Sequence, residues 1–376
     1  MSPKRLGSSG LKAVVKVEEE IYLNALRLVP GLGSGRLSQL LAGFPGAKGV
    51  WQARPEELAR ILGPGKQVEA LTHGRTVIEP EREWEKLLLA GIRVTTLGSS
   101  DYPSNLAEIY NPPLILYYRG SLDGLDLSLA IVGSRQATPY GRVAATTLAR
   151  DMGAAGFAIV SGFARGVDSA AHRGALNAQA RTVAVFGCGL DTIYPRENRS
   201  LCAEIIERGA VVSDFPLGVQ PLSANFPARN RIISGLSLGT LVVEGREKSG
   251  SLITADFALE QGRDVFAVPG PINSEYSRGP HKLLKQGAKL VESAGDILEE
   301  YAHLVSPALQ IKFAEFSYPA EYTGLMEILS LEPLHVDVIC RKLKTAPEKL
   351  AALLLQLELS GRIRQLSGGY YVRNFL

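Results

Sequence analysis

An aromatic ring, a guanidinium and an amide are grouped at the start of one predicted helix, in the stretch NFPARNRIISGLS at residues 225–237. An asparagine and a proline open this stretch, as is common in the first turn of a helix. Phe226, Arg229 and Asn230 stand at positions i, i+3 and i+4, so they share one helix face. An unpaired nucleotide needs a flat ring for its base and cationic donors for its phosphate, and this face supplies both. The structural alternative is that Phe226 staples the helix to the core and Arg229 pairs with a carboxylate.

Two further stretches have the composition of anion-binding loops. KSGSLITA (residues 248–255) follows a predicted strand and opens a helix, so the amides of its Gly-Ser pair should face an anion. VGSR (residues 132–135) offers the same arrangement after another strand, with an arginine beside the loop. With the helix face described above, these loops give the candidate nucleic-acid-binding residues Gly133, Ser134, Arg135, Phe226, Arg229, Asn230, Lys248, Gly250 and Ser251.

Familiar catalytic and cofactor sites fit the sequence poorly. FGCGLDT (residues 186–192) lacks the third glycine and the immediate helix that a dinucleotide site needs. The Gly-x-Ser-x-Gly match around Ser237 lies between a helix and the following strand, which is the reverse of a nucleophile elbow. Asp168 and His172 stand at i and i+4, and we expect this pair to tether a loop rather than to exchange protons. We therefore expect no catalytic residue and no cofactor.

The candidate residues all follow short apolar runs that alternate with helix-length stretches. The runs, each ending near a glycine, serine or proline, are LSLAIVGS, FAIVSG, TVAVFG, AVVSDF, GTLVVEG and DVFAVPG. Such runs between helices predict a parallel sheet covered on both faces. The expected fold class is therefore α/β, with a Rossmann-like doubly wound, mainly parallel sheet whose ligands bind beyond the carboxyl ends of the strands.

A helical unit is expected before this sheet. Residues 20–75 contain short helical stretches separated by glycine turns, and VPGLG at residues 29–33 is typical of the hairpin in a helix-hairpin-helix or SAM-like module. Such a hairpin exposes backbone amides that can hold a phosphate. A small packing domain without any nucleic-acid role explains the same pattern equally well.

A winged helix is expected after the sheet. Residues 321–376 predict a helix, a short helix, a longer helix and then a two-strand ribbon turned at Gly368-Gly369. The presumed recognition helix, residues 347–359, is mostly alanine and leucine and has Lys349 as its only base. This composition favours protein contact or dimerisation over sequence-specific DNA reading. The expected domains are 1–80, 81–316 and 317–376.

Composition narrows the class of protein further. The chain has 376 residues, of which 45% are hydrophobic, and a net charge of +3. No apolar run reaches the ~18 residues of a membrane span, and the N-terminus lacks the apolar core of a signal peptide. The three cysteines have no metal-binding spacing and form no disulfide framework. We therefore expect a cytoplasmic protein with no metal and no membrane association.

Five long motifs resemble those of the DNA processing protein A family (DprA, also called Smf), across roughly residues 95–295. They are IVGSRQATPYG, IVSGFARGVDSAAHRGAL, FGCGLDTIYPRENRSL, NFPARNRIISGLS and LVVEGREKSGSLITADFALEQGRDVFAVPG. The resemblance implies a non-enzymatic protein that binds and protects single-stranded DNA during natural transformation and loads the RecA recombinase onto it. It also implies a homodimer formed through the Rossmann-like domain.

The resemblance assigns a role to each motif residue. Arg135 and Arg229 are expected to hold backbone phosphates, and Phe226 is expected to stack on a base. Hydrogen-bond donors are expected at Asn230, Gly250 and Ser251. The chain departs from the family pattern at Pro280 and His281, in SRGPHKLLKQGA, and at Asp214, where glutamate is common.

A different class remains as the alternative. Phosphoribohydrolases of the lysine-decarboxylase-like (LOG) group resemble this sheet and hydrolyse nucleotides with the glutamate of a PGGxGTxxE signature. The comparable stretch here, EKSGSLITADFALEQG, lacks both the double glycine and that glutamate spacing. The sequence therefore favours strand binding over nucleotide hydrolysis.

Overall fold

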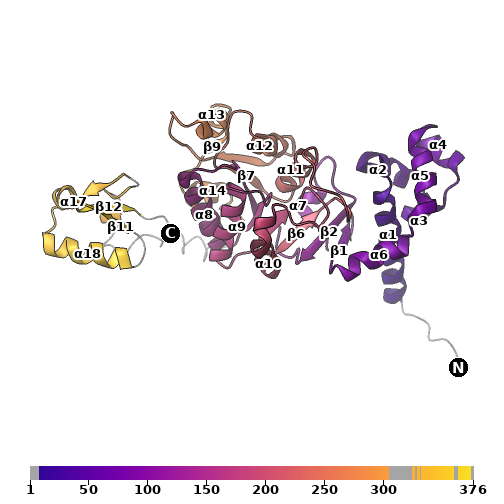
Figure 1. The fold of residues 1–376 in the computed structure, drawn as a ribbon, viewed down its shortest axis with the longest axis horizontal. Helices are drawn as coiled ribbons and strands as arrows, with labels where there is room; N and C mark the ends of the chain where they lie inside the picture. Colours follow the sequence, from indigo (N-terminus) through magenta and orange to yellow (C-terminus); the bar gives the residue numbers. More distant parts are fainter. Residues whose placement is uncertain (1–7, 305–323, 327, 331, 360–362, 374–376) are drawn as a thin grey trace, which may run out of the picture.

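The computed structural model contains a bundle of N-terminal helices, a central sheet covered by helices, and a small C-terminal unit (Figure 1). It describes residues 8–304, 324–326, 328–330, 332–359 and 363–373. Within these residues, no helix combines the length and the apolar character needed to cross a bilayer.

Nine strands form the central sheet in the order β1-β2-β6-β5-β4-β3-β7-β8-β9. The strands from β6 to β9 in this order are mutually parallel, whereas β1 and β2 are antiparallel to their neighbours. The predicted α/β fold class and its mainly parallel sheet are confirmed, and each predicted apolar run contains a strand. The strands are β1 (Arg93–Thr96), β2 (Ile115–Gly120), β3 (Ser128–Val132), β4 (Ala158–Ser161), β5 (Thr182–Val185), β6 (Ala210–Ser213), β7 (Gly239–Val242), β8 (Asp264–Ala267) and β9 (Lys289–Leu290).

Both faces of the sheet are buried because successive side chains of a strand point to opposite sides. In β3, Leu129 and Ile131 pack into one apolar cluster, and Ala130 and Val132 pack into another. The first cluster contains residues of α8 (Pro139–Ala154), α9 (Val167–Asn177) and α14 (Ala294–Glu300). The second contains residues of α7 (Ser104–Ala107), α11 (Asn225–Gly235), α12 (Gly250–Glu260) and α13 (Arg278–Lys285). Residues of α10 (Arg199–Arg208) pack with β5 and β6 in a further cluster.

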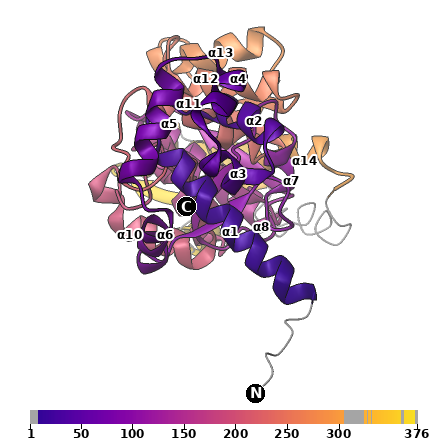
Figure 2. The same cartoon turned by 90° about the vertical axis from the view of Figure 1, so that its right-hand side faces the viewer.

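The N-terminal unit consists of short helices after a long first helix. The helices are α1 (Ser8–Leu28), α2 (Ser34–Gly43), α3 (Gly46–Gln52), α4 (Pro55–Leu62), α5 (Lys66–Val77) and α6 (Pro80–Leu89). The predicted glycine turns lie between α1 and α2 and between α4 and α5. Figure 2 views this end of the molecule, with α1 running diagonally across it.

The N-terminal helices pack directly against the sheet domain. One apolar cluster contains both Leu26 of α1 and Tyr117 of β2. Tyr117 Oη donates a hydrogen bond to Asn24 Oδ1 at 2.9 Å, and Arg27 Nη2 donates to the Asp214 carbonyl oxygen at 2.7 Å. The N-terminal helices and the sheet domain therefore share an apolar core. The domain boundary expected near residue 80 stays a prediction.

Over its described residues, the C-terminal unit has the expected short helix, longer helix and two-strand ribbon, and a short third strand that was not predicted. The bounds of the expected first helix lie outside the described residues. The elements of this unit are the third strand β10 (Leu334–His335), α17 (Val336–Leu343), α18 (Pro347–Leu359), β11 (Ile363–Leu366) and β12 (Tyr370–Arg373). Helix α18 matches the predicted recognition helix. Its Leu350 and Leu354 belong to the same apolar core as Ile339 of α17. The ribbon turns at Gly368 and Gly369, whose φ values of 80° and 76° favour glycine.

Candidate nucleic-acid interface

The sheet has a topological switch point between β3 and β7. From β3 the chain adds β4, β5 and β6 on one side, and it then crosses to β7 on the other side of β3. The loops that follow β3 and β7 therefore leave in opposite directions and open a crevice at the carboxyl edge of the sheet. This is where open parallel sheets bind their ligands.

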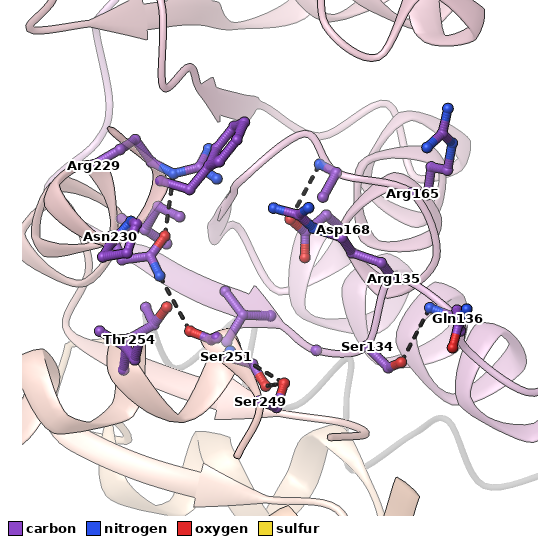
Figure 3. A pocket seen from close by; sticks show the side chains of 18 of the residues that line it. Ser134, Arg135, Gln136, Arg165, Asp168, Arg229, Asn230, Ser249, Ser251 and Thr254 are labelled. Atoms are coloured by element: carbon purple, nitrogen blue, oxygen red, sulfur yellow. Dashed lines mark hydrogen bonds between the residues drawn. The ribbon is translucent and has the colours of Figure 1, made fainter. Parts of the chain in front are cut away.

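A cleft of about 880 Å³ lies at this edge. Its walls come from the loops after β3, β4 and β7 and from the first turns of α11 and α12 (Figure 3). The structure brings together all nine predicted residues in its lining: Gly133, Ser134, Arg135, Phe226, Arg229, Asn230, Lys248, Gly250 and Ser251. Their contacts with nucleic acid remain predictions.

Phe226 is the centre of an aromatic and cationic cluster. The guanidinium carbons of Arg135 and Arg229 lie 5.0 Å and 5.8 Å from its ring centroid, within cation–π range. The Tyr194 ring lies 5.9 Å away, centroid to centroid. A Cβ atom at Gly187, after β5, would come within 2.9 Å of the Phe226 ring, so the ring approaches the backbone closely there. Phe226 is half-buried, so part of its surface stays open to the cleft.

Arg229 lies at the floor of the cleft and is only 4% exposed. Its Nη1 donates hydrogen bonds to the carbonyl oxygen of Gly162 at 2.6 Å and to that of Val185. Burial lowers the pKa of Arg229 to about 10, although the charge of Asp168 acts in the opposite direction. Arg229 is therefore a charged side chain fixed by the ends of β4 and β5, rather than a mobile surface arginine.

Asn230 connects the two helices that border the cleft. Its Nδ2 donates to the Gly250 carbonyl oxygen at 3.2 Å, and its Oδ1 accepts from Arg229 Nε at 3.2 Å. The side chain that was expected to donate to a ligand therefore also holds α11 against α12.

The first turn of α12 is capped by Ser249. Its Oγ accepts from the Ser251 amide at 3.3 Å and lies 2.8 Å from Ser251 Oγ. No atom lies within 4 Å of where a Cβ would stand at Gly250, so the backbone there is open to the cleft. An anion therefore has room at this turn, but the Ser251 amide already donates to the Ser249 cap, and the expected anion contact stays a prediction.

Packing explains Gly133 in the loop after β3. A Cβ at this position would lie 2.7 Å from Val167 Cγ2 and 2.8 Å from the Glu244 carbonyl oxygen. Ser134 Oγ accepts from the Gln136 amide at 3.1 Å and shapes the same loop. Arg135 projects from this loop and is exposed.

Cations dominate the lining of the cleft. Arg135 and Lys248 form no ion pair among the described residues, whereas Arg165 pairs with Glu197. Of the described residues that line the cleft, Asp168 is the only acid. Burial raises the pKa of Asp168, and the charge of Arg229 opposes this effect.

Several lining residues were not predicted as site residues. They are Gln136, Arg165, Asp168, Tyr194, Arg246, Ser249, Thr254 and Tyr276. Arg165 and Arg246 follow the ends of predicted strands, so the rule that selected Arg135 also indicates them. Tyr276 follows β8 in a loop with no such signal.

Asp168 and His172 have different hydrogen-bond partners in the structure. His172 is fully buried, and its Nδ1 lies 2.7 Å from Thr182 Oγ1, whereas Asp168 Oδ2 accepts from the Ala164 amide at 3.2 Å. These two residues are therefore bound separately rather than as an acid–base pair. His281 Nε2 lies 3.0 Å from the Gly270 carbonyl oxygen, and neither it nor Pro280 is among the described lining residues.

The carboxylate of Glu244, which follows β7, has a structural role. Glu244 accepts hydrogen bonds from the Thr138 amide at 2.9 Å and from Thr138 Oγ1 at 2.6 Å, at the start of α8. Its carboxylate therefore occupies the position at which a helix N-terminus would bind a phosphate. Among the described residues, no group of three metal-binding side chains is present.

Comparison with known proteins gives matches across most of the chain. The family model of DNA recombination-mediator protein A matches residues 93–302, and that of the DprA winged helix domain matches residues 314–369. Protein Smf of Escherichia coli is 42% identical over 280 residues, covering 72% of this chain and 75% of its own. Protein Smf of Synechocystis is 34% identical over 395 residues, covering 94% and 99%.

Solved structures give the same result. DNA processing protein A of Streptococcus pneumoniae superposes with a TM-score of 0.65 at 36% identity, covering 75% of this chain and 97% of its own. That of Helicobacter pylori, described for its single-stranded DNA binding mode, has a TM-score of 0.51 at 32% identity and covers 57% and 98%. With the parallel sheet, the winged helix and the motif residues gathered in one cleft, these matches show that the chain belongs to the DNA processing protein A (DprA/Smf) family.

Proposed function

We propose that this protein binds single-stranded DNA along the cleft, with little dependence on base sequence. The observation that carries the proposal is that Arg135 and Lys248, which have no ion-pair partner among the described residues, line the same cleft as the Phe226 ring. Every base has a face that can stack and every nucleotide has a phosphate, so this combination suits a strand of any sequence. The binding mode named for the Helicobacter pylori relative supports the same ligand.

The contacts divide the lining into three roles. Arg135 and Lys248 contact phosphates, because their charges have no acidic partner among the described residues. Phe226 stacks on a base, and a phosphate binds at the open backbone of Gly250 at the start of α12, where Ser249 Oγ already accepts from the Ser251 amide. Arg229 adds charge from below and holds the Phe226 ring in place, and Asn230 keeps the two helices together.

We propose no catalytic step for this site. Hydrolysis of a nucleotide would need a free carboxylate as general base. Glu244 is bound to Thr138, and Asp168 is buried beside Arg229 at the cleft floor. These contacts support binding without turnover and disfavour the nucleotide-hydrolase alternative.

We further propose that the bound strand is delivered to the RecA recombinase during natural transformation, in the cytoplasm. Membership of the family supports this step. We also propose a homodimer through the Rossmann-like domain, which would present two clefts. The test is RecA filament formation on DNA coated with single-stranded-DNA-binding protein. The expected result is faster filament growth when this protein is added.

The binding proposal is tested by fluorescence anisotropy with labelled oligothymidylates. Wild-type affinity should fall steeply as salt rises, because each phosphate contact on a single strand contributes ~0.7 to the logarithmic salt slope. Arg135→Ala and Lys248→Ala should each weaken binding and reduce the slope. Arg208→Ala, at the exposed end of α10, is the matched control and should leave both unchanged. Equal affinity for the three variants and wild type would refute the cleft as the binding site.

A further inference from the structure

A second aromatic ring lines the cleft apart from the Phe226 cluster. Tyr276 belongs to the short helix η2 (Glu275–Ser277) and is half-buried in the cleft lining. The guanidinium carbon of Arg246 lies 5.2 Å from its ring centroid. Tyr276 Oη donates to Gln136 Oε1 at 3.3 Å, which fixes the ring against the loop after β3. The cleft therefore holds two separate pairs of an aromatic ring and an arginine.

The strand order places the two pairs over different parts of the sheet. Phe226 packs at Gly187, after β5, beside Arg229, which reaches the carbonyl oxygen of Gly162 after β4. Tyr276 lies over β3 and β7, because its carbonyl oxygen accepts from the Gly245 amide at 2.7 Å and its hydroxyl contacts the β3 loop. The loop after β3 contacts both rings, with Arg135 over Phe226 and Gln136 bound to the Tyr276 hydroxyl. Each ring therefore offers its own place for a base.

We propose that Tyr276 and Arg246 form a second nucleotide position, occupied by the same extended strand that contacts Phe226. The ring of Tyr276 stacks on a base, and the guanidinium of Arg246 pairs with a phosphate of that strand. This inference rests on the proposed binding of single-stranded DNA. It adds a second stacking position beside the loops after β3 and β7, from which Arg135 and Lys248 are proposed to contact phosphates.

Arg246 already has an anionic partner that a phosphate can replace. Its Nη2 donates to Glu275 Oε1 at 2.8 Å, and the two side chains are 55% and 53% exposed. An ion pair this exposed is held weakly, because water screens both charges. A phosphate of the strand therefore replaces the Glu275 carboxylate as the partner of Arg246. In the free protein, Glu275 holds that place.

The test measures affinity for oligothymidylates of increasing length in wild type, Tyr276→Leu, Tyr276→Phe and Phe226→Leu. Tyr276→Leu keeps apolar bulk but removes the flat ring, so it should bind strands that reach both positions roughly 5- to 150-fold more weakly, the range measured for loss of one stacked base. It should bind the shortest strands, which occupy only the Phe226 position, like wild type. Tyr276→Phe keeps the ring and should stay within about twofold of wild type. Glu275→Gln should tighten binding because it removes the competing charge.

The outcomes separate the two proposals. Wild-type affinity of Tyr276→Leu at every length, together with weak binding by Phe226→Leu, would overturn the second position and leave strand binding in place. Equal losses in Tyr276→Phe and Tyr276→Leu would also overturn it, because the contacts of the hydroxyl with Gln136 and Arg246 would then matter rather than the ring. Absence of wild-type binding at all lengths would refute strand binding itself. Should Tyr276→Leu fold poorly, photocrosslinking of wild type to a strand containing 5-iodouracil decides: an adduct on Tyr276 supports the position, and its absence overturns it.

Discussion

Arg135 lies over the ring of Phe226, with its guanidinium carbon 5.0 Å from the ring centroid, although the two residues come from different loops of the sheet edge. A guanidinium is both a cation and a flat surface, so it can stack on a base as well as pair with a phosphate. A base that enters the cleft therefore meets a ring and a guanidinium that are already arranged together. The relationship makes the shape of Arg135 as important as its charge.

The first prediction separates these two properties of Arg135. Arg135→Ala should weaken binding of oligothymidylate by about 1.5–3 kcal/mol, as for loss of a hydrogen bond to a charged group, and should reduce the salt slope. Arg135→Lys should restore the slope because the charge returns, but it should not restore full affinity because the plane is absent. Anisotropy titrations across a salt series measure both quantities. Full recovery by lysine would show that only charge matters.

The second prediction concerns the stability of the fold around Arg229. Arg229→Ala should lower the free energy of unfolding by roughly 1–3 kcal/mol, because the buried carbonyl oxygens of Gly162 and Val185 lose their donor. It also removes the charge that favours the ionised form of the buried Asp168 carboxyl group. Urea denaturation followed by circular dichroism measures the change. Arg229→Ala combined with Asp168→Asn should recover part of the loss. A single variant as stable as wild type would show that Arg229 is not a structural charge, and its effect on DNA binding could then be read directly.

The fold was predictable where strands are buried on both faces. The central strands carry continuous apolar runs, which the sequence shows directly. Strand β1 lies at the sheet edge and buries only Thr95 fully, and β9 has two residues, so neither contains an apolar run of useful length. Strand β2 has such a run but was not predicted, because no helix separates it from β3 and it therefore breaks the alternation of strands and helices.

The sequence predicted residues that line the cleft, but not how deeply each of them is buried. All nine residues line one cleft because the carboxyl ends of parallel strands share an edge. Arg229 was expected to reach outward to a phosphate, yet it is bound by the carbonyls of Gly162 and Val185, which are distant in the sequence. Tyr276 was missed because its place depends on the path between β8 and α13. Tertiary packing sets the burial of Arg229 and the path of the loop that contains Tyr276. A local sequence pattern does not predict either of them.

The third prediction is a pH dependence that arises from His172. Burial, with the charges of Arg229 and Arg173, lowers the pKa of His172 to about 3 from its ordinary 6.5. The unfolded chain therefore binds a proton at a higher pH than the folded protein does. The contribution to stability is fully present above pH ~6.5 and is lost as pH falls toward ~3, by up to about 1.4 kcal/mol per pH unit.

His172→Asn isolates this effect, because asparagine can keep the contact with Thr182 but does not titrate. The variant should be less stable than wild type at pH 7, since it leaves unfilled space beside Phe163. Its stability should nevertheless fall less steeply between pH 6 and pH 4, as measured by urea denaturation at each pH. Asp168 acts in the opposite sense in both proteins, because burial raises its pKa. Parallel curves for the two proteins would contradict a buried neutral His172.

The last prediction tests whether the position of the Phe226 ring controls binding. Gly187→Ala places a Cβ 2.9 Å from Phe226 Cδ1, which forces the ring to shift. Stability should fall by about 1–3 kcal/mol from overpacking, and strand affinity should fall with it. Gly35→Ala is the matched control, since no atom lies within 4 Å of its Cβ position in α2, and it should leave affinity unchanged. Adding Phe226→Leu to Gly187→Ala should recover stability, because the smaller side chain relieves the contact, but should not recover affinity. A Gly187→Ala variant that is destabilised yet binds DNA like wild type would show that the strand does not depend on this ring.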